Sequence, residues 1–164
     1  MNATFEKIDS YSELCERLRR RQQGVILGHD DESHKEYFLA SLSGCLIGVC
    51  SQGQGIQPSI LQDAVHGTVW IGYNSSLANV DTSRCRKTLV IRLDSVFFCI
   101  LCHMQDGSVI VIHELGATRV DAFGRVLWSV STSVVTAFAE GSDEIDLTTE
   151  DGTVRVNKES GSRL

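Results

Sequence analysis

The feature that most constrains this chain is a change in its hydrophobic period at Gly24. Before that residue, Tyr11, Leu14, Cys15 and Leu18 follow the spacing i, i+3, i+4 and i+7, which places them on one face of a helix. After it, apolar and polar residues mostly alternate, as they do in half-buried strands. The sequence therefore predicts one amphipathic helix followed by a long run of strands.

The helix is predicted over residues 10–23. Ser10 and Glu13 fit a capping box, in which each side chain satisfies a free backbone amide at the helix start. Arginines at 19–21 lie at the helix end, where the macrodipole favours positive charge, and Gly24 suits the position just beyond it. We interpret these arginines as a solvated helix end rather than a nucleic-acid site.

The rest of the chain divides into short strands with brief connections, so that sequential neighbours are expected to pair antiparallel. Residues 25–50 are predicted to hold short strands, and 51–66 an irregular loop in which Pro58 is suited to start one helical turn. Residues 67–158 are predicted to form a β-meander. Its candidate strands are 68–73, 77–80, 87–93, 95–104, 108–113, 117–121, 125–130, 133–139, 143–149 and 152–157.

The predicted fold class is mainly β (α+β by count): an N-terminal amphipathic helix packed on an antiparallel β-meander. The 164 residues are expected to form a single domain, 1–164. The pattern leaves three arrangements of the strands open: a sandwich, a partly closed barrel, or propeller-like sheets. A two-residue turn at 151–152 would place Leu147 opposite Val156, with polar residues of both strands on the other face.

The segment Cys99-Ile-Leu-Cys102-His103 has the spacing of a haem-attachment motif. In a regular strand, however, residues i and i+3 point to opposite faces, so the two thiols could not hold one ligand. We interpret the segment as buried strand. A turn at 106–107 would then pair Cys102 with Val111 in a hairpin that is apolar on both faces and lies at the centre of the sheet.

Residues 1–23 are polar and show no export signal, and the most apolar stretch, 96–102, is too short for a membrane helix. We therefore expect a cytoplasmic protein without membrane contact, whose six cysteines stay reduced and pack as small hydrophobes. The net charge of −6 argues against binding a phosphate backbone, so no nucleic-acid partner is predicted.

Three segments resemble one another, each with a glycine turn followed by an alternating strand: 67–81, 106–121 and 151–161. Their spacing of about 40 to 45 residues is the length of a propeller blade. Gly67-Thr-Val-Trp-Ile-Gly72 resembles the blades of sensor-type β-propellers. The stretch from Gly124-Arg-Val-Leu-Trp128 to Gly161 is similar to a quinoprotein-type blade. The resemblance implies a meander of hairpins. About 2.5 blades are too few for a closed propeller, which would need several chains, and no ligand residues carry over.

The irregular segment and the aromatic residues beside it are the predicted binding surface. Long irregular segments in compact domains are often functional, and aromatics with a polar group can line a groove. The candidate residues are Gln54, Gln57, Asp63, His66, Trp70 and Tyr73.

We expect a non-enzymatic binding module with a protein partner, and one version of it is a small acidic inhibitor or immunity-type protein. Self-association through a sheet edge, as a homo-oligomeric propeller-like scaffold, is an alternative. The rival is an enzyme that assembles its site from distant strands, using His66, His103 or His113 with Asp63 or Glu114. No catalytic residue, metal or cofactor is predicted, and the acidic stretch 29–34 is interpreted as a solvated turn.

Overall fold

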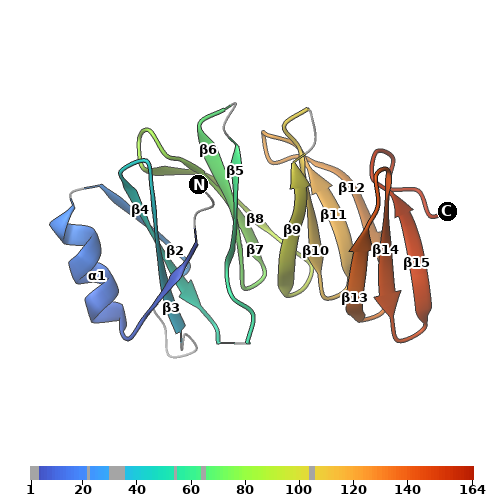
Figure 1. Cartoon of the computed structure of the whole chain (residues 1–164), viewed down its shortest axis with the longest axis horizontal. Coiled ribbons are helices and arrows are strands. Elements are labelled where there is room, and N and C mark those ends of the chain that lie inside the picture. The colour runs from blue at the N-terminus through green and yellow to red at the C-terminus, as the bar shows by residue number, and fades with distance from the viewer. Residues whose placement is uncertain (1–3, 22, 30–35, 54, 64–65, 104–105) are drawn as a thin grey trace. The chain divides into compact units, whose positions relative to one another are not determined.

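The computed structural model describes residues 4–21, 23–29, 36–53, 55–63, 66–103 and 106–164. The chain divides into two compact units, unit 1 over 1–91 and unit 2 over 92–164. The prediction of a single domain, 1–164, stays a prediction, and each unit is described by itself. Figure 1 shows an N-terminal helix followed by a succession of β-sheets along the chain.

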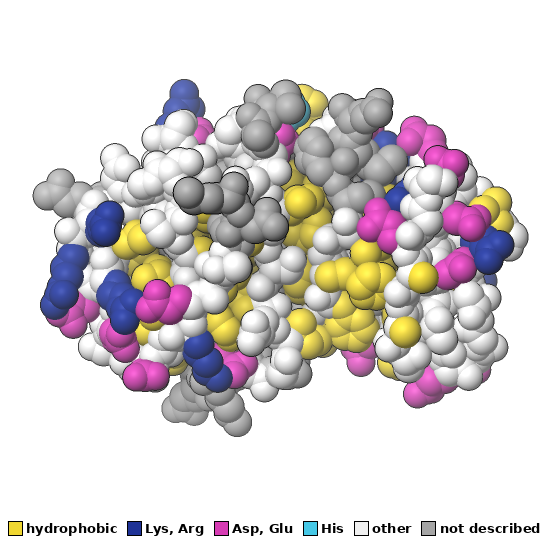
Figure 2. Space-filling view, viewed as in Figure 1, with side chains coloured by type: hydrophobic (Ala, Val, Ile, Leu, Met, Phe, Trp, Pro, Cys, Tyr) yellow, Lys and Arg dark blue, Asp and Glu magenta, His cyan; other side chains and the backbone are white. Residues whose placement is uncertain are grey.

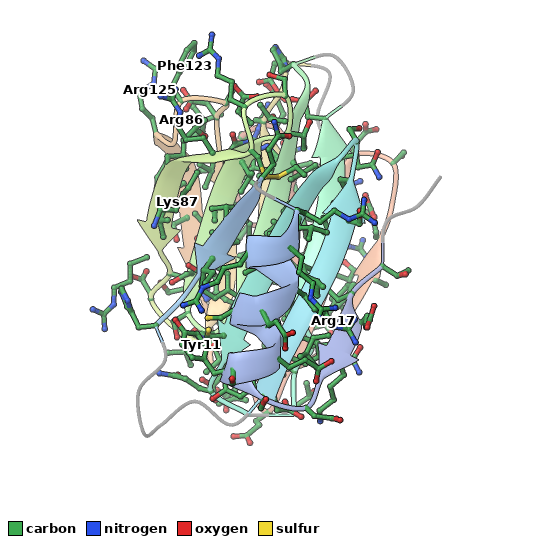
Figure 3. The ribbon with its side chains drawn as sticks, turned by 90° about the vertical axis from the view of Figure 1, so that its left-hand side faces the viewer. Tyr11, Arg17, Arg86, Lys87, Phe123 and Arg125 are labelled. Carbon is green, nitrogen blue, oxygen red and sulfur yellow. A yellow bond between two sulfur atoms is a disulfide. The ribbon has the colours of Figure 1, made fainter. Side chains whose placement is uncertain are left out.

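The helix α1 runs over Tyr11–Arg20 and begins at the predicted cap. The Ser10 side chain accepts a hydrogen bond from the Glu13 amide, while the helix ends three residues earlier than predicted, with Arg21 as its C-cap. Leu14 and Leu18, on the predicted stripe, are buried against sheet A. The amphipathic helix is confirmed, and Figure 3 shows α1 lying across the face of its sheet.

Sheet A has four strands in the order β1-β3-β4-β2. One face packs against α1 and the other against the next sheet of unit 1. Gly48 permits the close approach of the helix, since a Cβ there would lie 3.1 Å from Leu14 and Leu18 carbons. The bounds are β1 Glu6–Ile8, β2 Gly24–Leu27, β3 Glu36–Leu42 and β4 Cys45–Ser51.

Two features of sheet A differ from the predictions. Strand β1 was not predicted, because three residues are too few to show an alternating pattern. Strand β2 pairs with β4 in parallel, with Val25 opposite Ile47, although sequential strands were expected to pair antiparallel. The helix between β1 and β2 carries the chain across the sheet, which makes the parallel pairing possible.

Sheet B completes unit 1 with the order β5-β6-β7-β8. Its strand β5 lies in the segment predicted as an irregular loop with a helical turn after Pro58, and that prediction is wrong. The strand forms because Ile60 and Leu61 pair with Ile71 and Trp70 of β6, a tertiary pairing that the short segment does not reveal. The bounds are β5 Ser59–Asp63, β6 Thr68–Tyr73, β7 Ser76–Asp81 and β8 Arg86–Arg92.

A disulfide joins Cys45, at the start of β4, to Cys85, in the turn between β7 and β8. The prediction that all six cysteines are reduced is therefore wrong for this pair. The two residues are 40 positions apart in sequence, and the packing of sheets A and B brings them together. Disulfides persist in oxidising compartments, so this bond lends no support to the cytoplasmic prediction. No helix among the described residues is long and apolar enough to cross a membrane.

Unit 2 holds two further sheets, C with the order β12-β11-β10-β9 and D with the order β13-β14-β15. They pack through apolar residues that include Ile110 and Ile112 of sheet C and Ile145 and Leu147 of sheet D. The bounds are β9 Phe97–His103, β10 Val109–His113, β11 Gly116–Val120, β12 Val126–Ser131, β13 Val135–Glu140, β14 Glu144–Thr149 and β15 Gly152–Asn157.

Both predicted hairpin registers are shifted in the structure. Val156 lies opposite Ile145, not Leu147, because residues 150–151 form the turn. A shift of two keeps each residue on its predicted face, so Leu147 and Val156 are still buried while Arg155 is exposed.

The second hairpin also differs from its prediction. Cys102 lies opposite Ile110, not Val111, a shift of one residue, and β9 carries a bulge just beyond this pair, between Cys102 and Ile100. Its strand β10 is fully buried, but β9 forms the edge of sheet C rather than its centre, and Phe98 and Leu101 are only half-buried.

The fold class is confirmed as mainly β, with helix α1 packed on antiparallel-rich, propeller-like sheets. None of the sheets that the described residues form closes into a barrel. The blade-length repeat is also visible. Segments 67–81 and 106–121 form the β6–β7 and β10–β11 hairpins, which are the second and third strands of sheets B and C, and 151–161 covers β15. Trp128 lies in sheet C, and its indole N–H donates to the Lys158 carbonyl beyond sheet D.

Sheets A and D each have one face of distinct character. Helix α1 covers one face of sheet A, and one face of sheet D is polar. On that face Arg155 donates two hydrogen bonds to Asp146, and Thr148 is exposed.

Candidate functional site

The structure brings two of the six predicted binding residues together. The buried Asp63 carboxylate accepts hydrogen bonds from the His66 backbone amide, at 3.1 Å, and from the His66 Nδ1, at 2.6 Å. The imidazole is 50% exposed. The pair joins the end of β5 to a residue just before β6, so it stabilises the β5–β6 connection.

The other predicted binding residues do not form a surface. Trp70 is 1% exposed, and its indole N–H has no hydrogen-bond partner among the described residues. Tyr73 packs in the core between sheets A and B, and burial raises the pKa of its hydroxyl. Gln57 is exposed, and Gln54 lies outside the described residues. Trp70 and Tyr73 therefore do not line a groove, because both rings are buried in unit 1.

His113, a possible general base of the rival enzyme, is buried in a chain of hydroxyl groups. The Ser95 hydroxyl accepts a hydrogen bond from the Leu115 amide and also lies 2.8 Å from His113 Nδ1, within hydrogen-bond distance. His113 Nε2 lies 3.2 Å from the Thr118 hydroxyl, which in turn contacts Ser129 at 3.0 Å. Burial lowers the pKa of His113. The ring is buried, so its evident role is to form hydrogen bonds with the neighbouring hydroxyl groups.

The remaining elements of the rival enzyme are not assembled among the described side chains. The side chain of His103 lies outside the described parts. No group of three or more His, Cys, Asp or Glu residues that could hold a metal occurs within the described ranges. The acidic stretch predicted as a solvated turn is described only at His29.

The cysteine motif on β9 is part of an apolar edge. Cys99 packs against the core between sheets C and D, and burial raises the pKa of its thiol to about 12. A thiol with so high a pKa is a poor nucleophile and metal ligand. The bulge places Cys99 opposite Ile112 and Cys102 opposite Ile110. The strict alternation assumed for these two cysteines is therefore wrong, although the interpretation of Cys99 as a packing residue stands.

The best candidate site is a strip of apolar side chains along the edge strands of unit 2. It consists of Phe98, Cys99 and Leu101 of β9, which are half-buried, and Phe138 of β13, which is 41% exposed. We call this set the apolar strip. Phe138 lies opposite Leu147, so it belongs to the face of sheet D that packs toward sheet C. Figure 2 shows hydrophobic side chains gathered over this part of the molecule.

One end of the apolar strip is fixed by an ion pair. The Lys158 ammonium donates to Glu140 at 2.7 Å and to the Gly141 carbonyl at 2.6 Å, which holds the end of β13. Glu140 is close enough to Cys99 to raise its pKa further. The strip therefore has a polar, ordered rim, as protein-binding patches do.

Unit 2 also carries most of the net negative charge of the chain. It holds six Lys and Arg residues against eleven Asp and Glu residues, while unit 1 holds nine against ten. Five of the six net negative charges therefore belong to unit 2. Such a charge attracts basic partners and speeds their association at low salt.

The sequence pattern does not single out the apolar strip, although it contains one sign of a binding surface. The segment 96–102 is apolar on both faces, and this was interpreted as burial at the centre of a sheet. A strand at a sheet edge gives the same pattern when one face packs on the core and the other forms a binding surface. Phe138, followed by alanine and Glu140, gave no pattern of its own.

No protein-family model matches the sequence, and no curated protein matches it. Solved structures match in fold. BamB from Moraxella catarrhalis aligns with 99% of this chain over 51% of its own, with a TM-score of 0.55 and 15% identity. Apo AztD from Citrobacter koseri aligns with 87% over 45% of its own, with a TM-score of 0.51 and 12% identity. The chain thus spans about half the length of these structures. Its fold is similar to that of quinoprotein-type β-propellers.

Proposed function

We propose that this chain is a non-enzymatic interaction module that binds a protein through the apolar strip of unit 2. The observation that carries the proposal is the exposure of Phe138 on the face of sheet D that packs toward sheet C, together with the half-burial of Phe98 and Leu101 on the edge strand of sheet C. Aromatic side chains that are anchored in a packed core and exposed at one edge are typical binding hot spots. The β-propeller-like scaffold supports the proposal only as a fold that presents surfaces, because a fold does not determine a function.

A photo-crosslinking residue at position 138 of the full chain tests the proposal in an extract of the native host. The control carries the same residue at Thr148, which is exposed on the other face of sheet D. We expect a discrete crosslinked protein from position 138 and none from position 148. Equal crosslinking at both positions, or none at 138, would contradict the proposal.

A second candidate is the more specific one, a small acidic inhibitor or immunity-type protein that covers a basic site. The observation that favours it is the concentration of negative charge on unit 2. Such a complex would weaken strongly as salt rises, because screening acts on charge pairs, whereas contact through the strip alone would not. Measuring crosslinking at position 138 at low and high salt separates these two versions.

A further inference from the structure

Strand β12, on the opposite edge of sheet C from the apolar strip, is a sheet edge along which no further strand pairs among the described residues. Its six residues, Val-Leu-Trp-Ser-Val-Ser, include no charge and no proline. Natural proteins usually guard an exposed edge with lysine, proline or a cover, since a free edge can pair with another strand. Val126 and Leu127 at the start of β12 are 54% and 47% exposed.

The backbone of β12 offers hydrogen-bonding groups on its free side. The Thr132 amide donates to the Leu115 carbonyl, which sets the alternation of bonded pairs between β11 and β12. In an antiparallel ladder, every second residue directs its backbone N–H and C=O groups away from the partner strand. On β12 the residues that do so are Ser129 and Ser131. Arg163 Nη2 donates to the outward Ser131 carbonyl at 2.6 Å, which confirms its direction.

One end of this edge carries a rigid aromatic knob. Phe123 is 80% exposed at the β11–β12 turn, and Figure 3 shows it beside Arg125. Asp121 fixes the turn, because its carboxylate accepts from the amides of Phe123 and Arg125 and from the Arg125 side chain at 2.6 Å. The Arg125 guanidinium also lies 5.6 Å from the ring centroid. The knob is therefore ordered before any partner arrives.

The other end of the edge carries a cleft of about 330 Å³. Residues 131–133, residues 151–154 of the β14–β15 hairpin, Thr149 and Arg163 line it. A cavity of about 150 Å³ admits benzene in an engineered protein, so an aromatic ring fits a cleft of this size. A guanidinium such as that of Arg163 binds the face of an aromatic ring favourably.

We propose that two copies of this chain pair through β12, antiparallel and around a two-fold axis beside Ser129. A two-fold axis at the middle of β12 brings each end of the strand against the opposite end of the same strand in the second copy. The Phe123 ring at one end therefore meets the cleft at the other end. Arg125 and Ser133 both lie four residues from Ser129, so they come opposite each other. Each Phe123 ring then enters the cleft of the second copy. The apolar strip lies on another edge and stays open.

Sedimentation velocity of the full chain over a range of concentrations tests the dimer. We expect Phe123→Ser to weaken it about 100-fold, since each dimer buries two such rings and each is worth about tenfold or more. Ser133→Trp, which fills the cleft, should also weaken it. The matched control is Phe138→Ser, an exposed phenylalanine outside the interface, which should leave the dimer unchanged.

A cysteine at the axis supplies a second test. Ser129→Cys should form a disulfide-linked dimer, because Cα atoms of directly paired antiparallel residues lie about 5.5 Å apart, within disulfide range. Ser142→Cys, in an exposed turn, should not. The proposal is overturned by a chain that stays monomeric, by a dimer unaffected by both Phe123→Ser and Ser133→Trp, or by equal cross-linking at both cysteines.

Discussion

Different contacts stabilise the interior of each unit, and the two units expose different amounts of apolar surface. Of the seven large hydrophobic side chains that are exposed among the described residues, six belong to unit 2, and only Val90 belongs to unit 1. Unit 1 buries its sheets beneath α1 and links them by a disulfide. The difference indicates that unit 1 is built mainly for stability, whereas unit 2 keeps apolar surface available for other molecules.

A buried arginine, Arg119, stabilises the interior of unit 2, whereas buried leucines such as Leu14 and Leu18 stabilise unit 1. The Arg119 side chain is 4% exposed and donates to Ser108, to Asp106 at 2.8 Å and to the Glu159 carboxylate at 2.9 Å. It also donates to the carbonyl of Glu159, in the turn that follows β15. This network ties that turn to sheet C, so polar contacts in unit 2 replace the helix and disulfide of unit 1.

The largest expected effect is on the helix of unit 1. Leu14→Ala removes a fully buried side chain from between α1 and sheet A, so it should lower the free energy of unfolding by about 3 to 4 kcal/mol. The measurement is denaturant unfolding combined with hydrogen exchange, and the exchange should rise in unit 1. The control Glu16→Ala changes an exposed residue of the same helix and should cost little. Equal loss of protection in both units would show that they do not differ as described.

The disulfide comes next. Cys85→Ala should destabilise unit 1 by about 2 to 4 kcal/mol, because the bond closes a loop of 40 residues and restricts the unfolded chain. A reducing agent should have the same effect on the natural chain and none on the variant. Thermal unfolding with and without reductant makes the comparison. If reductant destabilises both proteins alike, the bond is not what holds unit 1.

The buried arginine should matter somewhat less. Arg119→Leu removes hydrogen bonds to charged partners but leaves Asp106 and Glu159 exposed to water, so we expect a loss of about 2 kcal/mol. Hydrogen exchange should rise in β15 and the turn after it. Arg155→Leu, which breaks an exposed pair with Asp146 on sheet D, is the control and should cost under about 1 kcal/mol.

The smallest expected effect is a pH dependence confined to unit 2. The pKa of His113 is lowered in the folded chain, so the unfolded chain takes up the proton first as the pH falls. Its contribution to stability is therefore complete above pH 6.5, the ordinary histidine pKa, and declines as the pH falls below that value toward the lowered pKa.

Unfolding measured between pH 7 and pH 5 should show this decline in the natural chain, and the range lies above ordinary aspartate pKa values. His113→Asn should reduce the decline. A decline of the same size in His113→Asn would assign the pH dependence to other groups.

Local patterns predicted most of the fold. The cap at Ser10 and the strand Thr68–Tyr73 match the prediction, because capping and alternation are properties of neighbouring residues. Strand β5 and the Cys45–Cys85 bond were missed, since both depend on partners distant in sequence. The division of the strands into separate sheets also depends on tertiary packing, which the alternation does not encode.

The site was harder to predict than the fold. Asp63 and His66 do contact each other, but as the support of a turn, and Trp70 is buried. Whether an aromatic residue is exposed depends on which strand lies at the edge of a sheet. The sequence shows that β9 is apolar on both faces without showing that it is an edge. Phe138, on the edge strand β13 of sheet D, was overlooked for the same reason.

The central claim, that unit 2 binds a protein through the apolar strip, is tested most directly by hydrogen exchange of the full chain. The measurement compares the free chain with the chain in complex with the protein crosslinked from position 138. The account expects added protection in β9 and β13 and none in α1 or β3 of unit 1. Protection confined to unit 1, or none in β9 and β13, would contradict it.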